Sequence, residues 1–198
     1  MVIVVNSSSY NAEAQPQKLQ FPKLQQADLM VINSGNAPTT VNFNITDGYT
    51  IQPVLWNLTL PSTVTFDDKG NFYVAEAGYA YGDLKPQPRL IKVQQNGNTS
   101  ILLDRMLNGP ITDIEFYGGK LYVSHRGIIS TVDPISGLIK DIITGLPSIG
   151  DHHNNQMAFG PDGRLYFGQG TATNSGVVGI DNYAFGWLKI APLIGVPL

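Results

Sequence analysis

The residues of this sequence best suited to chemistry gather around position 152. The run Asp151-His152-His153-Asn154 brings together a carboxylate, two imidazoles and an amide, and the third histidine, His125, stands beside Arg126. Histidine titrates near neutral pH, and an adjacent carboxylate can orient its ring or favour its charged form, as a general base requires. Together with Glu76, these side chains could bind a polyhydroxylated or carboxylated small molecule.

The same residues also fit plainer interpretations. Residues 151–155 could form a solvated polar loop, and His125-Arg126 a solvated turn. A metal centre built from His125 and His152 is disfavoured, because the adjacent His152 and His153 point apart on extended backbone and no carboxylate spacing supports it. We therefore assign no metal ligand.

Several other chemistries lack their motifs in this sequence. The chain has no cysteine, no phosphate-binding glycine loop and no Gly-x-Ser-x-Gly elbow. Thiolate metal sites, nucleotide cofactors and serine hydrolysis are therefore without support.

A repeated pair of short strands must position the candidate residues. Residues 64–75, 114–124 and 157–168 each contain two β-rich runs around a tight Gly or Asp-Gly turn, which is a strong hairpin signal. Tyr73, Tyr122 and Tyr166 occupy the same place in the three copies and recur at intervals of 49 and 44 residues. Residues 89–93, 99–103, 128–132 and 138–143 supply further strands. Four strands per unit at this spacing predict an all-β fold, a β-propeller of about three blades of four antiparallel strands.

Antiparallel blades also predict which loops share a face. The loop between the second and third strands and the loop into the next blade lie on one face, and the hairpin turns lie on the other. This rule places Glu76, His125, Arg126 and residues 151–154 on one rim. It leaves the turns at residues 67–70, 117–119 and 160–163 with a structural role.

The three blades do not close a ring. Only the first two strands of the third blade are well marked, because residues 176–180 form a short run and the tail at 190–198 differs from the earlier units. Each blade buries its faces against its neighbours, so an open arc leaves two faces in water. We expect self-association through the open blade faces, or a longer parent chain that supplies the missing blades. Residues 1–46 are treated as an extended leader and 47–198 as the partial propeller domain.

Composition limits the partners and the location. The chain has 198 residues, is 42% hydrophobic and 14% charged, and carries a formal net charge of -3, so a nucleic-acid partner is not expected. The apolar start, residues 1–5, is too short to span a membrane. Followed by Ala12-Glu13-Ala14, it predicts a clipped export signal, and hence an exported protein, extracytoplasmic or membrane-associated through a missing N-terminal segment.

Two longer motifs resemble those of the glucose/sorbosone dehydrogenase family. The specific one is Gly150-Asp-His-His-Asn-Asn-Gln-Met-Ala-Phe-Gly-Pro-Asp-Gly-Arg-Leu-Tyr-Phe-Gly-Gln-Gly170, followed by Thr173-Asn-Ser-Gly-Val-Val-Gly179. The other, at residues 61–78, is shared with many propellers, including NHL-repeat proteins and lactonases. The likeness covers about residues 47–190.

The resemblance implies a six-bladed, exported enzyme that oxidises an aldose or related sugar with pyrroloquinoline quinone (PQQ). In that family a histidine separated by seven intervening residues from the Gly-Pro-Asp turn removes the proton of the anomeric hydroxyl, and His152 matches that position. Asp151, His153, Asn154, His125, Arg126 and Glu76 are then rim candidates for contacts with a small sugar substrate. The Arg-Asn-Pro loop and the basic residues that hold the quinone belong to later blades. We therefore expect this chain to be a fragment that lacks most of the PQQ site, and any calcium ion of the full-length parent.

Two alternatives stay open. One is a non-catalytic propeller that binds a carbohydrate or a protein partner through the same rim. The other is a lactonase-like metal enzyme, for which only Glu76 and Asp151 are candidate acidic ligands.

Overall fold

The computed structural model of the chain describes residues 2–7, 24–31, 39–78, 86–148 and 152–170. These residues form β-strands, turns and loops, and they contain no helix that is long and apolar enough to cross a membrane. The chain divides into two compact units, Met1–Leu58 and Thr59–Leu198. Residues 47–58, which we assigned from the sequence to the propeller domain, fall in the first unit by this division. The Ala12-Glu13-Ala14 motif lies outside the described residues.

The first unit contains two antiparallel strand pairs. Strand β1 (Val2–Ser7) pairs with β4 (Tyr49–Leu55), and β2 (Leu24–Val31) pairs with β3 (Thr39–Thr46). A tight turn at Asp47-Gly48 leads from β3 into β4, and Gly48 adopts a positive φ of 86° there. The described residues of the part treated as an extended leader therefore include the three strands β1, β2 and β3.

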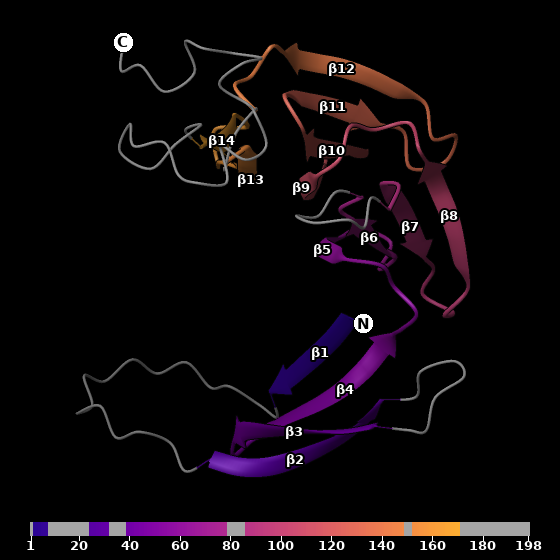
Figure 1. Cartoon of the computed structure of the whole chain (residues 1–198), viewed down its shortest axis with the longest axis vertical. Helices are drawn as coiled ribbons and strands as arrows, with labels where there is room; N and C mark the ends of the chain where they lie inside the picture. The colour runs from indigo at the N-terminus through magenta and orange to yellow at the C-terminus, as the bar shows by residue number, and fades with distance from the viewer. Residues whose placement is uncertain (1, 8–23, 32–38, 79–85, 149–151, 171–198) are drawn as a thin grey trace, which may run out of the picture. The chain divides into compact units, whose positions relative to one another are not determined.

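The second unit is a partial β-propeller, which confirms the predicted fold class. Its first blade is the sheet β5 (Pro61–Phe66), β6 (Phe72–Glu76), β7 (Arg89–Val93) and β8 (Thr99–Asp104). The second is β9 (Ile111–Tyr117), β10 (Lys120–His125), β11 (Ile128–Val132) and β12 (Ile139–Thr144). The pair β13 (Asn154–Phe159) and β14 (Leu165–Gln169) begins a third blade. In each complete blade, strands adjacent in sequence are adjacent in the antiparallel sheet (Figure 1).

Local sequence explains these strands. Strand β6 lies inside its sheet with a face on each side covered, so Tyr73, Val74 and Ala75 are all buried and the strand reads as a continuous apolar run. The turn between β9 and β10 consists of Gly118 and Gly119, both with positive φ, as a two-residue hairpin turn of type I′ requires. The hydrophobic core draws on the first two blades: Tyr73, Ala75, Leu90, Leu103, Leu107, Ile111, Ile114, Leu121, Val123 and Val132.

The blades contact one another through a repeated aromatic pair. The tyrosine of the second strand in each of the first two blades packs on a phenylalanine at or next to the end of the following blade's first strand. Tyr73 stacks on Phe116 with the ring centroids 6.5 Å apart, and Tyr122 lies edge-on to Phe159 at 4.7 Å. Two of the three aligned tyrosines that marked the repeat in the sequence, Tyr73 and Tyr122, therefore make blade-to-blade contacts.

Polar contacts between the first strands of the blades reinforce this packing. The Asp113 carboxylate accepts hydrogen bonds from the Thr63 hydroxyl (2.9 Å) in the first blade and from the Met157 N–H (2.6 Å) in the third. The Thr65 hydroxyl oxygen accepts from the N–H of Phe116 at 3.2 Å. The order of the three blades is thus fixed by specific bonds as well as by apolar burial.

Candidate functional site

One backbone hydrogen bond recurs at the same end of all three blades. The residue after the second strand donates its N–H to the carbonyl of the residue before the first strand. The three pairs are Ala77 to Leu60 (2.9 Å), Arg126 to Pro110 (3.2 Å) and Gly170 to His153 (3.0 Å). We call this end of the second unit the rim. Glu76, His125 and Gln169, the last residues of β6, β10 and β14, are therefore structurally equivalent.

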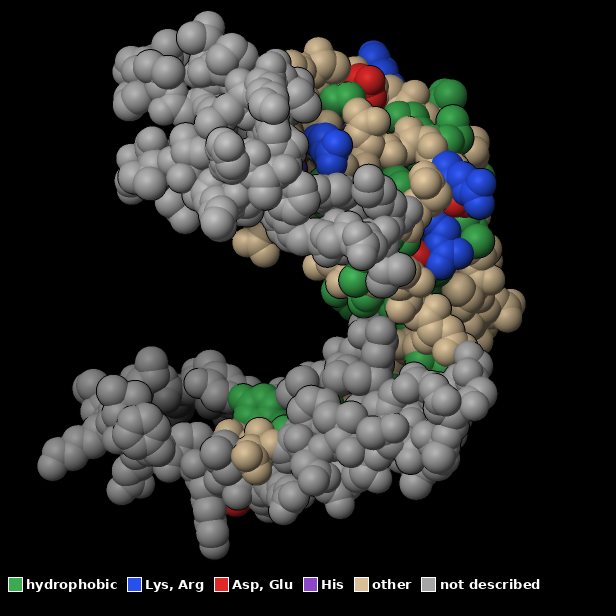
Figure 2. All heavy atoms as spheres, viewed as in Figure 1, with side chains coloured by type: hydrophobic (Ala, Val, Ile, Leu, Met, Phe, Trp, Pro, Cys, Tyr) green, Lys and Arg blue, Asp and Glu red, His purple; other side chains and the backbone are tan. Residues whose placement is uncertain are grey.

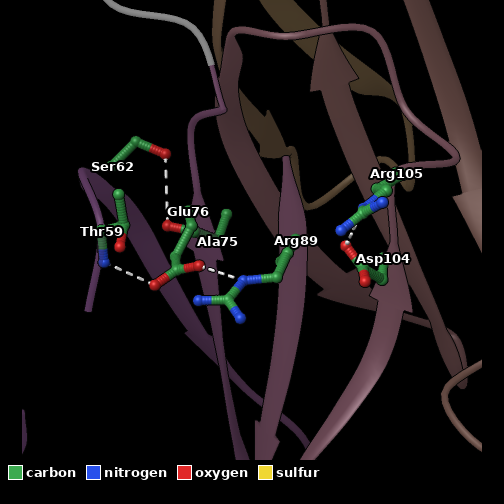
Figure 3. A network of polar contacts seen from close by, with 7 residues as sticks. All are labelled: Thr59, Ser62, Ala75, Glu76, Arg89, Asp104 and Arg105. Carbon is green, nitrogen blue, oxygen red and sulfur yellow. Dashed lines mark hydrogen bonds and ion pairs between the residues drawn. The ribbon is translucent and has the colours of Figure 1, made fainter. Parts of the chain in front are cut away.

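Glu76 is buried at the rim, and both oxygens of its carboxylate have hydrogen-bond partners (Figure 3). One carboxylate oxygen accepts from the Thr59 N–H at 2.6 Å, and the other pairs with Nε of Arg89 at 2.5 Å. The bond to Glu76 raises the pKa of Arg89. Glu76 thus holds the segment that leads into the first blade.

His125 holds the equivalent position in the second blade, and its ring is buried. Its Nδ1 accepts from the Asn108 N–H at 3.2 Å, so the ring proton is on Nε2 and is donated to the Ser130 hydroxyl at 2.8 Å. Ser130 in turn donates to Asp141 at 2.6 Å. Burial lowers the pKa of His125, although the Asp141 carboxylate partly offsets this effect. The structure therefore holds His125 as a neutral imidazole inside the second blade.

Asn154 is also buried, and it joins the third blade to the second. Its side-chain oxygen accepts from the Gly127 N–H at 2.9 Å. Its amide nitrogen donates to the Ser124 hydroxyl at 2.7 Å and to the carbonyls of His125 and Ile128 at 3.0 and 3.1 Å. These bonds attach the start of β13 to the turn between β10 and β11.

His153 lies half-buried beside this anchor. Its Nδ1 is 2.9 Å from the Ser148 hydroxyl oxygen and 3.2 Å from the Ser148 carbonyl oxygen. A carbonyl can only accept, so the proton is on Nδ1 and the lone pair is on Nε2. Burial lowers the pKa of His153, and the positive charge of Arg126 lowers it further. His153 is therefore a neutral imidazole with a defined tautomer, opposite to that of His125.

His152 is half-buried and lies against the end of β14. A Cβ atom placed on Gly170 would be 2.4 Å from the Cβ of His152 and 2.9 Å from the carbonyl oxygen of His153. Only a glycine at position 170 allows this approach. Gln169 holds the same region, because its amide donates to the carbonyls of Pro147 (2.6 Å) and Gly170 (2.9 Å).

The structure thus brings most of the predicted rim residues together in one hydrogen-bonded region between the second and third blades. His125, Arg126, His152, His153 and Asn154 belong to it, whereas Glu76 is at the equivalent place in the first blade. Asp151 lies outside the described residues. Sequence reasoning missed Ser148 and Ser130, because isolated serines carry no signal until the fold sets them beside a histidine.

A separate cavity of about 560 Å³ opens on the first strands of the blades. Its polar lining includes Thr63, Asp113, Glu115 and Gln156, and neither His152 nor His153 lines it. Burial raises the pKa of Glu115, and the nearby Asp113 carboxylate raises it further. The volume is in the range of small-molecule sites, but the cavity is distinct from the histidine region.

The charged side chains of the described residues are another candidate for a site. On the face shown in Figure 2, the Lys and Arg side chains of the described residues are scattered over the blades instead of forming one patch. Among the described residues, no three His, Asp or Glu side chains are grouped as the ligands of a metal ion would be.

The fold and the rim define the second unit as part of a β-propeller protein. The sequence matches no family model and no curated protein. Among solved structures, it is similar to a catalytically inactive variant of virginiamycin B lyase from Staphylococcus aureus, crystallised with quinupristin. The identity is 13% and the TM-score 0.42, with 74% of this chain and 39% of that chain covered. So distant a likeness identifies no reaction, and the fold assignment rests on the blades themselves.

Proposed function

We propose that the histidine region of the rim binds a small polyhydroxylated molecule of the sugar type, and that His152 removes a proton from one of its hydroxyl groups. The resemblance to glucose/sorbosone dehydrogenases suggests that this step belongs to the oxidation of an aldose or a related sugar by an exported enzyme. The location and the reaction are both proposals.

The observation that carries the proposal is the way the chain holds residues 152–154. Asn154 anchors the backbone, His153 is fixed by Ser148, and Gly170 lets the backbone of His152 approach β14 closely. A general base needs this kind of support, because its ring must be held within hydrogen-bond reach of the proton it removes. The neutral state of the neighbouring His153 also avoids a second positive charge beside the base.

The quinone cofactor implied by the resemblance is not matched by the described residues. Its carboxylates call for several cations, and the cation that acts on His153 is Arg126. We therefore derive no step through PQQ or calcium. We expect the 198-residue chain to bind the quinone weakly and to show no dye-linked sugar oxidation when PQQ is added. A measurable rate would contradict this expectation, and His152→Asn should then lower that rate by about 100-fold or more.

Histidine NMR tests the binding step directly, because the chain has only three histidines. We would titrate the chain with D-glucose and follow the ring signals, assigned with His152→Asn and His153→Asn variants. The ring signals of His152 should shift with saturable dependence, and those of His125 should not, because that ring is enclosed in the second blade.

The variants separate the roles of the two adjacent histidines. His152→Asn removes the reporting ring itself, so glucose binding to this variant is measured by isothermal titration calorimetry. That binding should be abolished without a change of fold, whereas His153→Asn should weaken the loop that Ser148 holds. Glucose binding that is unaffected by His152→Asn would reject the proposed role of His152.

A non-catalytic binding propeller is the second candidate, and one observation favours it. The polar side-chain atoms of Glu76, His125 and Asn154 make hydrogen bonds that hold the blades together. Fewer polar groups at the rim are therefore left to contact a substrate. This candidate predicts saturable carbohydrate or protein binding with no activity in any longer form of the chain. The structure does not support the lactonase-like alternative, because the Glu76 carboxylate that would bind the metal is already bonded to Thr59 and Arg89.

A further inference from the structure

The aromatic pair that joins successive blades has one exposed member on the first blade and one on the third. Within the chain, the tyrosine of one blade packs on the phenylalanine of the next, as Tyr73 on Phe116 and Tyr122 on Phe159. Phe66 of β5 occupies the place that Phe116 and Phe159 hold in β9 and β13. Unlike those two half-buried rings, the Phe66 side chain is 60% exposed.

The residue two places earlier shows the same pattern. Ile114 of β9 and Met157 of β13 are 1% and 7% exposed, whereas Val64, at the matching register of β5, is 41% exposed. Val64 and Phe66 therefore form an apolar face on the first blade that matches the buried faces of the second and third.

The third blade carries the other half of the contact. Tyr73 is fully buried under the second blade, but Tyr166, at the same place in β14, is 54% exposed. Its hydroxyl donates to Asp162 within its own hairpin at 3.0 Å, as that of Tyr73 does to Asp67. That bond holds the side chain in the orientation that its buried counterpart has. The Tyr166 ring is therefore already oriented to pack on a phenylalanine, as the Tyr73 ring does.

We propose that these two faces dock on each other between two copies of this chain, with Tyr166 of one copy on Phe66 of the other. A second copy fits because it carries the missing half of each contact, and the contact is one that the chain already makes twice within itself. Head-to-tail pairing of two copies forms the contact twice under a two-fold axis and leaves neither face in water.

The test is the mass of the 198-residue chain in solution, measured by sedimentation velocity from low to high micromolar concentration. The wild-type chain should form a discrete dimer of twice the 21.5 kDa monomer mass. Phe66→Lys and Tyr166→Asp should each raise the dimer Kd by about 100-fold or more, because each removes an aromatic anchor from both contacts. Ile135→Lys is the matched control, since Ile135 is 84% exposed on the turn between β11 and β12.

Mixing the two variants tests the head-to-tail geometry. A pair of one Phe66→Lys chain and one Tyr166→Asp chain has one wild-type contact and one contact that joins Lys to Asp, so the mixture should recover dimers that neither variant forms alone. Recovery supports the proposal.

Three outcomes would overturn it. A folded wild-type monomer at every concentration would show that residues of the same chain cover these faces. Dimers disrupted by Phe66→Lys but not by Tyr166→Asp would show that like faces pair. Dimers unaffected by both substitutions would place the interface elsewhere. Circular dichroism spectra that match the wild type establish that the variants remain folded.

Discussion

Replacing Asn154 by Ala should be among the most damaging single changes at the rim. The side chain is fully buried, and its loss removes the acceptor for the Gly127 N–H and the donor to the carbonyls of His125 and Ile128. Each buried group left without a partner costs about 1–3 kcal/mol, so the free energy of unfolding should fall by about 3–5 kcal/mol. For a chain of this size, that loss corresponds to a fall in Tm of about 10 °C.

Urea unfolding followed by tryptophan fluorescence and circular dichroism would measure the loss. The matched control is Asn155→Ala, because Asn155 is the next residue, has the same side chain and is exposed. It should change the free energy of unfolding by no more than about 0.5 kcal/mol. If Asn154→Ala were as mild as Asn155→Ala, the polar anchor between the blades would be refuted, because water or a shift of the backbone would then have replaced it at little cost.

Two further predictions concern pH and the approach of His152 to β14. Because burial lowers the pKa of His125 below its ordinary value of 6.5, the unfolded chain binds a proton that the folded chain does not. Stability should therefore fall as the pH drops below about 6.5, and His125→Gln should flatten that part of a stability-against-pH curve; an unchanged slope would reject the buried neutral ring. Gly170→Ala should displace the backbone of His152, lower Tm and remove the glucose-dependent shifts, because its Cβ would be 2.4 Å from that of His152. The control Gly168→Ala, whose nearest neighbour would be an ordinary contact at 3.6 Å, should leave both measurements near the wild-type values.

Equivalent rim positions perform one task with different chemistry. Glu76 and His125 each bond the backbone N–H of a residue 17 positions earlier, and Gln169 bonds a backbone carbonyl of the segment that leads into the third blade. A carboxylate, an imidazole and an amide thus each hydrogen-bond to the backbone of the segment that leads into their own blade. Polar residues that look like a cluster of ligands in the sequence can therefore be parts of a repeated structural fastening.

The blade strands, the turns and the partial propeller fold could be predicted because they depend on local properties of the chain. The observed strands β7 and β11 have the predicted bounds, and the other blade strands differ from prediction by a few residues at their ends. The Gly118-Gly119 turn follows from backbone sterics, and the repeated tyrosine position follows from the strand pattern around each turn, which short segments encode by themselves.

Which rim residues are buried, and in which protonation state, was decided by the tertiary structure alone. His125 and His153 have the same side chain and stand at the same rim, yet their protons lie on different ring nitrogens. The difference comes from the backbone N–H of Asn108 in one case and the carbonyl of Ser148 in the other. The sequence alone established the repeat and the candidate residues, because periodicity and turn chemistry are local. Hydrogen-bond partners and burial depend on segments far apart in the chain, so only the packed blades could assign them.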